Sequence, residues 1–159
     1  MEYVYWVLDD LLAGRPGPVE FPWNLNNLHA AGIQAVVSLN TEPDPAEITA
    51  AGLRHHSLPM TPSLPVVAAL QDLLLHELEP ALGAIHAEVN AGRPVLVHCH
   101  AGKDRTGVVL AAYLVRYRGL EIDAAIARVR AVKPSAMSAP GYEATAIRFA
   151  ERERTREHD

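Results

Sequence analysis

The sequence has little of several features that mark particular classes of protein. It contains one cysteine, no run of lysine or arginine, and only 6% aromatic residues. No apolar stretch reaches the roughly 18 residues that a membrane helix needs. The net charge of −5 and the scattered basic residues provide no surface for nucleic acid or for an anionic membrane. We therefore expect neither a nucleic-acid partner nor a membrane span.

The single cysteine, Cys99, limits the redox chemistry of the chain. An internal disulfide is impossible, and no second thiol could resolve an oxidised Cys99. The first residues, Met-Glu-Tyr-Val-Tyr-Trp-Val, have neither the basic segment nor the long apolar segment of a secretory signal. We expect a reducing, cytoplasmic location, where a free thiol persists.

Length and patterning predict the fold class. A chain of 159 residues, 49% hydrophobic and 21% charged, suits one compact α/β domain over residues 1–159. Short apolar or β-branched runs alternate with helical patterns, which predicts a central, mostly parallel sheet with helices on both faces. Strands are predicted at 3–7, 11–14, 33–39, 53–58 and 95–98. The strand at 3–7 is predicted to lie at the edge of the sheet. Helices are predicted at 24–31, 43–51, 64–90, 106–118, 121–132 and 140–154, the last fraying toward Asp159.

Two of these helices carry further predictions. Pro80 interrupts the 64–90 pattern, so we expect either a kink or two helices that meet near Glu79. The 106–118 pattern is strongly apolar and predicts a buried central helix. Tyr113 and Tyr117 are four residues apart and should pack on one face of it.

The segment Val95–Gly107, Val-Leu-Val-His-Cys-His-Ala-Gly-Lys-Asp-Arg-Thr-Gly, joins a predicted buried strand to that central helix. Gly102 lets the loop curl, so that several backbone N–H groups point into one bowl at the helix N-terminus. Such a nest binds a tetrahedral oxyanion, and Arg105 can add a bidentate guanidinium contact. Cys99 should lie beneath the bound phosphorus. The helix dipole, Arg105 and the amides together predict that Cys99 is a thiolate at neutral pH.

The pattern His98-Cys99-x5-Arg105-Thr106 resembles the signature loop of the cysteine-dependent protein tyrosine and dual-specificity phosphatases. Chance occurrence of His-Cys-x2-Gly-x2-Arg-Thr/Ser in a chain this long is on the order of 10⁻⁵. The resemblance implies a dual-specificity phosphatase-like fold and a metal-independent phosphomonoester hydrolase, with no cofactor.

The resemblance also implies a role for each residue of the loop. Cys99 would be the nucleophile that forms a phosphocysteine, and Arg105 would hold the equatorial oxygens of the phosphoryl group. Thr106 would donate its hydroxyl to the sulfur, and His98 would orient the loop from behind by hydrogen bonding. The residues implied in substrate binding are His100, Ala101, Gly102, Lys103, Asp104 and Arg105.

The general acid is where the sequence departs from the family. An Asp on a loop some 30 to 40 residues before the cysteine usually supplies the proton, but residues 58–65 keep the prolines of that loop without a carboxylate. Asp104 is the first candidate to replace that carboxylate, either as the acid or as a group that positions water. The triplet Lys103-Asp104-Arg105 resembles the loop of a subset of bacterial and lipid-directed phosphatases, in which the loop Asp is the proposed general acid. Glu143, after Pro140, and Asp72, on the long helix, are the others. If no acid acts, the enzyme is restricted to good leaving groups.

Other functions find less support in the sequence. His55-His56 and the pair His98 and His100 could suggest a metal, but adjacent strand residues point to opposite faces and no spaced ligand set completes a shell. A rhodanese-like sulfurtransferase is disfavoured because Arg105 and Thr106 match phosphatase chemistry. The main alternative is a catalytically weak pseudophosphatase that acts as a phosphate-binding module, which the missing loop carboxylate motivates.

The substrate stays open at this stage. A phosphorylated protein or a small phosphoester is expected. Lys103, and His100 when protonated, would add positive charge at the mouth and favour phosphoinositides or inositol phosphates. The short segments 60–65 and 135–143 predict a shallow pocket and hence dual specificity. The oligomeric state is open, with a monomer favoured.

Overall fold

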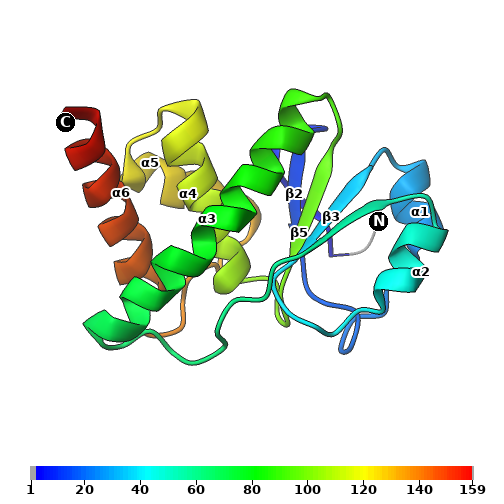
Figure 1. The fold of residues 1–159 in the computed structure, drawn as a ribbon, viewed down its shortest axis with the longest axis horizontal. Coiled ribbons are helices and arrows are strands. Elements are labelled where there is room, and N and C mark those ends of the chain that lie inside the picture. Colours follow the sequence, from blue (N-terminus) through cyan, green and yellow to red (C-terminus); the bar gives the residue numbers. More distant parts are fainter. Residues whose placement is uncertain (1–2, 159) are drawn as a thin grey trace.

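The computed structural model describes residues 3–158, which form a sheet of five short strands with helices on both sides (Figure 1). The strands are β1 (Tyr5–Leu8), β2 (Leu12–Arg15), β3 (Ala35–Ser38), β4 (Arg54–Ser57) and β5 (Val95–His98). Their order in the sheet is β1-β2-β5-β3-β4. β1 pairs with β2 in antiparallel fashion and the remaining pairs are parallel, which confirms the predicted α/β fold.

Helices cover the two faces of the sheet unequally. The helices are α1 (Leu25–Ala30), α2 (Pro45–Ala50), α3 (Ala68–Asn90), α4 (Arg105–Arg118), α5 (Ile122–Val132) and α6 (Tyr142–His158). Alternate residues of each strand face opposite layers: Ala35 and Val37 pack in the large cluster with α3 to α6, and Val36 packs with α1 and α2. The prediction of helices on both faces is confirmed.

The centre of the molecule is the unit β5–loop–α4. All four residues of β5 are buried, and so is every residue of α4 from Thr106 to Leu114, as predicted for this helix. Tyr113 and Tyr117 lie on one face of α4, with ring centroids 5.1 Å apart. β5 lies between β2 and β3 and runs parallel to both. The loop that follows β5 therefore emerges near the middle of the carboxyl edge of the sheet. Ligand sites in open parallel sheets lie at this edge.

The long helix differs from its prediction in two ways. α3 begins at Ala68 rather than at Leu64, because Val67 has extended backbone angles (φ −121°, ψ 155°) and precedes the first turn. The helix then continues through Pro80 to Asn90, so the two-helix alternative is wrong (Figure 1). Pro80 is exposed, while Leu78 and Leu82 keep an unbroken apolar stripe in the core. Packing of that stripe outweighs the one backbone hydrogen bond that proline removes.

The last helix is longer than predicted. α6 runs to His158 rather than to Arg154, and the fraying expected at Asp159 lies outside the described residues. Arg116 of α4 pairs with Glu79 of α3 and with Glu153 of α6, each through a contact of 2.6 Å. These ion pairs tie the three helices together. No helix within residues 3–158 has the length and the apolar character needed to cross a bilayer.

A buried carboxylate fastens the C-terminal end of α3 to the sheet. Glu88 is 1% exposed and contacts Nε of Arg54 at 2.8 Å, Nε of Arg93 at 2.6 Å and Nε2 of His56 at 3.1 Å. Burial alone would raise the pKa of Glu88, but hydrogen bonds from Arg93, Arg54 and His56 outweigh it and lower the pKa to about 2. The ionised carboxylate therefore stabilises the fold.

We expect Glu88→Gln to lower the free energy of unfolding near neutral pH by about 2 to 3 kcal/mol. The folded pKa of Glu88 lies below its ordinary value of 4.5. Its stabilising contribution is therefore complete above about pH 4.5 and is lost progressively as the pH falls from there through the folded pKa of about 2. Urea unfolding near pH 7 and near pH 3 measures this, with the exposed Glu151→Gln as control. A loss equally large at both pH values would contradict the electrostatic explanation.

Candidate active site

The loop between β5 and α4 is held by hydrogen bonds to its carbonyl groups from three separate parts of the chain. Those bonds run from Gly17 N–H to His100 O (2.9 Å), from the Tyr5 hydroxyl to Gly102 O (2.5 Å) and from Met137 N–H to Lys103 O (2.9 Å). A backbone that turns its carbonyls outward carries its amides on the inner side of the curve. That arrangement, beside the N-terminus of α4, is what an oxyanion cradle requires.

Close packing behind the loop depends on two glycines. Gly102 has φ +69°, and a Cβ there would collide with the backbone of Arg15 and Pro16. A Cβ at Gly14 would occupy the space of the Tyr5 ring. Burial, with a smaller contribution from Cys99, raises the pKa of Tyr5 well above its ordinary value of 10.0. Tyr5 therefore stays a hydrogen-bond donor to the loop.

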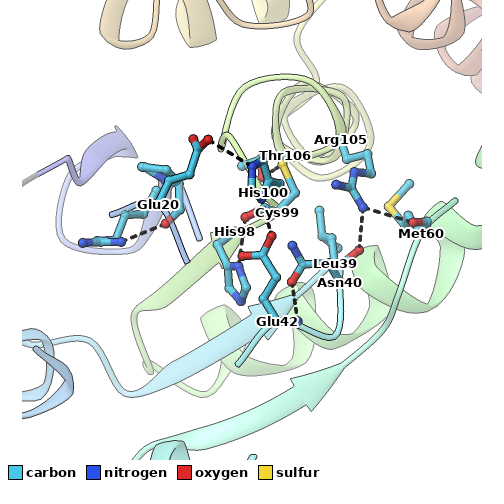
Figure 2. A network of polar contacts seen from close by, with 12 residues as sticks. Glu20, Leu39, Asn40, Glu42, Met60, His98, Cys99, His100, Arg105 and Thr106 are labelled. Carbon is cyan, nitrogen blue, oxygen red and sulfur yellow. Dashed lines mark hydrogen bonds and ion pairs between the residues drawn. The ribbon is translucent and has the colours of Figure 1, made fainter. Parts of the chain in front are cut away.

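Cys99 lies at the floor of the loop. Its side chain is buried, and the Thr106 hydroxyl donates to its sulfur at 3.1 Å. Arg105 begins α4, and its Nη1 donates to the carbonyl oxygens of Met60 at 3.2 Å and Leu39 at 3.4 Å (Figure 2). The sulfur, the hydroxyl and the guanidinium thus come together as the motif predicted.

A cavity of about 190 Å³ opens above the sulfur. It is smaller than most sites for drug-sized ligands and suits a phosphoryl group. Its lining comprises Cys99, His100, Ala101, Asp104, Arg105, Pro62, Leu64 and Tyr142. Of the predicted binding residues, Gly102 and Lys103 lie outside this lining and shape the loop from behind. Sequence reasoning missed Tyr142, whose only signal was its place in the segment after Pro140.

His98 supports the loop from within the sheet. The register of β3 and β5 places Ser38 opposite His98, and Nε2 of His98 lies 2.6 Å from the Ser38 hydroxyl. Nδ1 lies 3.2 Å from the Cys99 carbonyl, which can only accept, so Nδ1 carries the proton. Burial lowers the pKa of His98 to about 4, although the bond to that carbonyl opposes the shift. His98 is therefore neutral at physiological pH, and its partner Ser38 was not predicted.

His100 lies at the mouth of the cavity between two carboxylates, as Figure 2 shows. Its Nδ1 makes a short contact with Oε1 of Glu42, and its Nε2 lies 3.5 Å from Oε1 of Glu20. The hydrogen bond that Nδ1 donates to Glu42 is the main reason that the pKa of His100 is raised above its ordinary value of 6.5. The sequence analysis did not identify Glu42, because only the tertiary structure brings residues 42 and 100 together.

Asp104 lines the cavity, but both of its carboxylate oxygens are engaged. Oδ2 accepts from Lys103 Nζ at 2.6 Å, and Oδ1 accepts from the Ala139 amide at 3.2 Å. Lys103 also donates to the Ser138 hydroxyl at 3.0 Å. The positive charge of Lys103 is therefore partly neutralised by its neighbour and directed toward the 135–139 segment.

The other predicted acids lie elsewhere. Glu143 is exposed and pairs with Arg130 at 2.7 Å, so the first turn of α6 brings Tyr142 to the cavity instead. Asp72 is exposed on α3 and pairs with two arginines of α6. Neither carboxylate belongs to the cavity lining.

The 58–65 loop borders the cavity without a carboxylate of its own and is held by one from α3. Oε1 of Glu77 accepts from the Thr61 amide at 2.9 Å, and Oε2 accepts from the Thr61 hydroxyl at 3.1 Å. A Cβ at Gly141 would collide with the Pro65 carbonyl, so the segment before α6 packs directly on this loop. Within residues 3–158, no group of three or more His, Cys, Asp or Glu side chains is placed to bind a metal ion.

Comparison with known proteins gives a consistent picture. The family model described as "Dual specificity phosphatase, catalytic domain" matches residues 23–152. Dual specificity phosphatase 28 of Homo sapiens is 43% identical over 72 residues, which are 45% of this chain and 40% of that protein. Dual specificity protein phosphatase 12 of Mus musculus is 36% identical over 118 residues, which are 74% of this chain and 33% of that protein. The chain thus spans less than half the length of these relatives.

A solved structure shows the same fold along nearly the whole chain. The crystal structure of human DUSP28 superposes with a TM-score of 0.77 at 28% sequence identity, covering 97% of each chain.

The hydroxyl of Tyr5 gives the loop its most remote support, and Tyr5→Phe removes it. We expect the free energy of unfolding to fall by about 1 to 3 kcal/mol, because the buried Gly102 carbonyl loses its partner. The inhibition constant for inorganic phosphate should rise severalfold as the cradle loosens. Tyr117→Phe, on α4, is the matched control. Unchanged phosphate affinity in a destabilised Tyr5→Phe would show that the bond supports the fold and not the site.

Proposed function

Because the chain belongs to the dual specificity phosphatase family, we propose that it is a metal-independent phosphomonoester hydrolase that works through a phosphocysteine at Cys99. The observation that carries the proposal is the Thr106 hydroxyl, 3.1 Å from the Cys99 sulfur, at the floor of a cavity that Arg105 also lines. A purely structural cysteine needs neither neighbour. The cytoplasmic location expected for a free thiol is part of this proposal.

In the first step the sulfur of Cys99 attacks phosphorus. The P–S bond forms as the P–O bond of the ester breaks, and negative charge builds on the equatorial oxygens. The loop amides and the Arg105 guanidinium are the groups that would stabilise this charge.

In the second step water attacks the phosphocysteine and the sulfur departs. The hydroxyl of Thr106 stabilises the leaving thiolate through the hydrogen bond that it already makes. We assign Asp104 to the positioning of the attacking water. Lys103 and the Ala139 amide hold its carboxylate at the cavity wall, where it can accept a hydrogen bond from the attacking water and orient it.

For the substrate we propose a phosphorylated protein or a small phosphoester. The cavity of about 190 Å³ is walled by Pro62, Leu64 and Tyr142, so it accepts a phosphoryl group and part of its carrier. The ion pair with Asp104 weakens the case that Lys103 recruits substrates with several phosphates. Phosphoinositides therefore remain the alternative substrate class, and a phosphate-binding pseudophosphatase remains the alternative function.

We expect reduced wild-type protein to hydrolyse p-nitrophenyl phosphate with chelator present. Cys99→Ser should lower kcat/KM by more than about 10⁴-fold, because the hydroxyl cannot replace the thiolate. His76→Asn, at an exposed position of α3, controls for general effects of substitution.

Two outcomes would contradict the proposal. Loss of activity on chelation would show a metal-dependent reaction. Absence of hydrolysis by the reduced wild type, with retained binding of inorganic phosphate, would favour the phosphate-binding module.

For Asp104→Asn we expect kcat to fall by about 10²-fold or more while kcat/KM for p-nitrophenyl phosphate changes little, because the second step slows and the first does not. Rapid mixing should show a burst of p-nitrophenol equal to the enzyme concentration. If kcat/KM falls as strongly as kcat, Asp104 acts in the first step instead.

The same measurements test whether Glu143 and Asp72 take part in the reaction. Glu143→Gln and Asp72→Asn should change kcat and kcat/KM by less than about twofold, because these side chains pair with arginines outside the cavity.

A further inference from the structure

The imidazole of His100 is an ionisable group of the cavity wall that has no part in the steps above. It belongs to the residue that directly follows the nucleophile, and its side chain is 45% exposed at the cavity mouth. The loop at residues 58–65 offers no carboxylate to protonate a leaving group. His100 is therefore a proton-carrying group in a cavity that needs one.

Glu42 is placed to serve this imidazole. It comes from the turn between β3 and α2, its side chain is 17% exposed, and its Oε1 contacts Nδ1 of His100. Its other oxygen, Oε2, is buried and finds no hydrogen-bond partner among the described residues. A Cβ at Gly17 would collide with both that oxygen and the Cys99 carbonyl. The carboxylate therefore packs closely against Gly17 and the start of the loop at residues 99–104. A buried carboxylate with one partner binds that partner strongly when it is a cation.

The charges around His100 favour its protonated form. Glu42 lies on one side and Glu20, from the loop between β2 and α1, on the other. Asp104, Arg105 and the Cys99 thiol line the cavity across from it. The hydrogen bond to Glu42 is the largest influence on the pKa of His100 and raises it; burial opposes this, and the charges of Glu42 and Glu20 add to the rise. The ring therefore keeps its proton to a higher pH than an ordinary histidine does.

The two ring nitrogens differ in what they can do. Nδ1 is fixed by Glu42. Among residues 3–158, Nε2 has only the contact of 3.5 Å with Glu20, which is longer than a normal hydrogen bond and involves a side chain that is 57% exposed. A carboxylate on one nitrogen of an imidazole orients the ring and stabilises its cation while the other nitrogen exchanges protons. Nε2 is thus the atom available to a substrate.

We propose that His100, oriented and charged by Glu42, is the general acid of this phosphatase and replaces the carboxylate missing from residues 58–65. As the P–S bond forms and the P–O bond breaks, the Nε2 proton passes to the leaving oxygen and yields the free alcohol. In the second step, water gives a proton to the neutral imidazole as the new P–O bond forms and the S–P bond breaks. Thiolate and imidazolium are both restored. The inference rests on the proposed function.

The first test compares two leaving groups of nearly equal size. For His100→Asn we expect kcat/KM to fall by about 10²-fold or more on phenyl phosphate, but by less than about tenfold on p-nitrophenyl phosphate, whose leaving oxygen needs little protonation. His76→Asn should change both values by less than twofold. Equal losses on the two substrates would overturn the proposal and leave His100 as a phosphate-binding charge.

The second test uses the pH dependence. With Glu42→Gln the alkaline limb of the kcat/KM profile should move to lower pH, and activity should recover toward the wild-type value as the pH is lowered. NMR titration of the His100 ring should show the same shift. His100→Asn should lack this limb. A Glu42→Gln profile scaled down at every pH without movement would mean that Glu42 only supports the fold.

A third set of measurements does not depend on whether the His100 and Glu42 variants fold. Glu20→Gln, at an exposed position, should move the alkaline limb in the same direction by a smaller amount. In the wild type itself, a His100 ring that titrates below 6.5, the ordinary histidine value, would refute the proposal.

Failure of this inference is distinguishable from failure of the proposed function. If the wild type shows no hydrolysis that depends on Cys99, both are wrong. If hydrolysis depends on Cys99 but neither the leaving-group test nor the pH profile responds to His100 and Glu42, only the assignment of the acid is wrong.

Discussion

The phosphate loop, residues 99–104 between β5 and α4, is held in shape by hydrogen bonds from other parts of the chain. Its carbonyls are held outward by Tyr5 of β1, by Gly17 after β2 and by Met137 before α6, and the amides are left to the inner side as a consequence. Six residues of loop cannot impose that conformation alone, because turning several amides toward one another concentrates like partial charges. The distant contacts supply the opposing free energy. The conformation of the loop therefore depends on the packing of the sheet edge and of the segment that contains Met137 against it.

The two histidines that flank Cys99 show how position decides charge. His98 is fully buried, pairs with the Ser38 hydroxyl, and stays neutral because desolvation disfavours its cation. His100 is half-exposed and contacts Glu42, so its cation is favoured. The same residue type, two positions apart, is a hydrogen-bonding support in one case and a proton-carrying group in the other.

Carboxylates are arranged around this cradle with separate structural duties. Glu77 holds the 58–65 loop by accepting two hydrogen bonds from Thr61. Asp104 joins the phosphate loop to the segment that precedes α6 through Ala139. Gly141 then lets that segment pack against Pro65. The walls of the cavity are thus fixed to one another, and a loop that no longer carries an acid is still held at the mouth.

The sequence by itself determined the fold class and the order of strands and helices, because these depend on local periodicity. The proposed roles of Cys99 and Arg105 rest on one contiguous motif. The prediction of two helices that meet near Glu79 was wrong. Burial of the apolar stripe of α3 outweighed the tendency of Pro80 to end a helix. Tertiary structure alone decided which acids face the cavity. It paired Asp72 and Glu143 with arginines and set Glu42 against His100 across 58 residues of chain. No local pattern reports such a contact, since it arises from the register of parallel strands, which aligns the ends of β3 and β5.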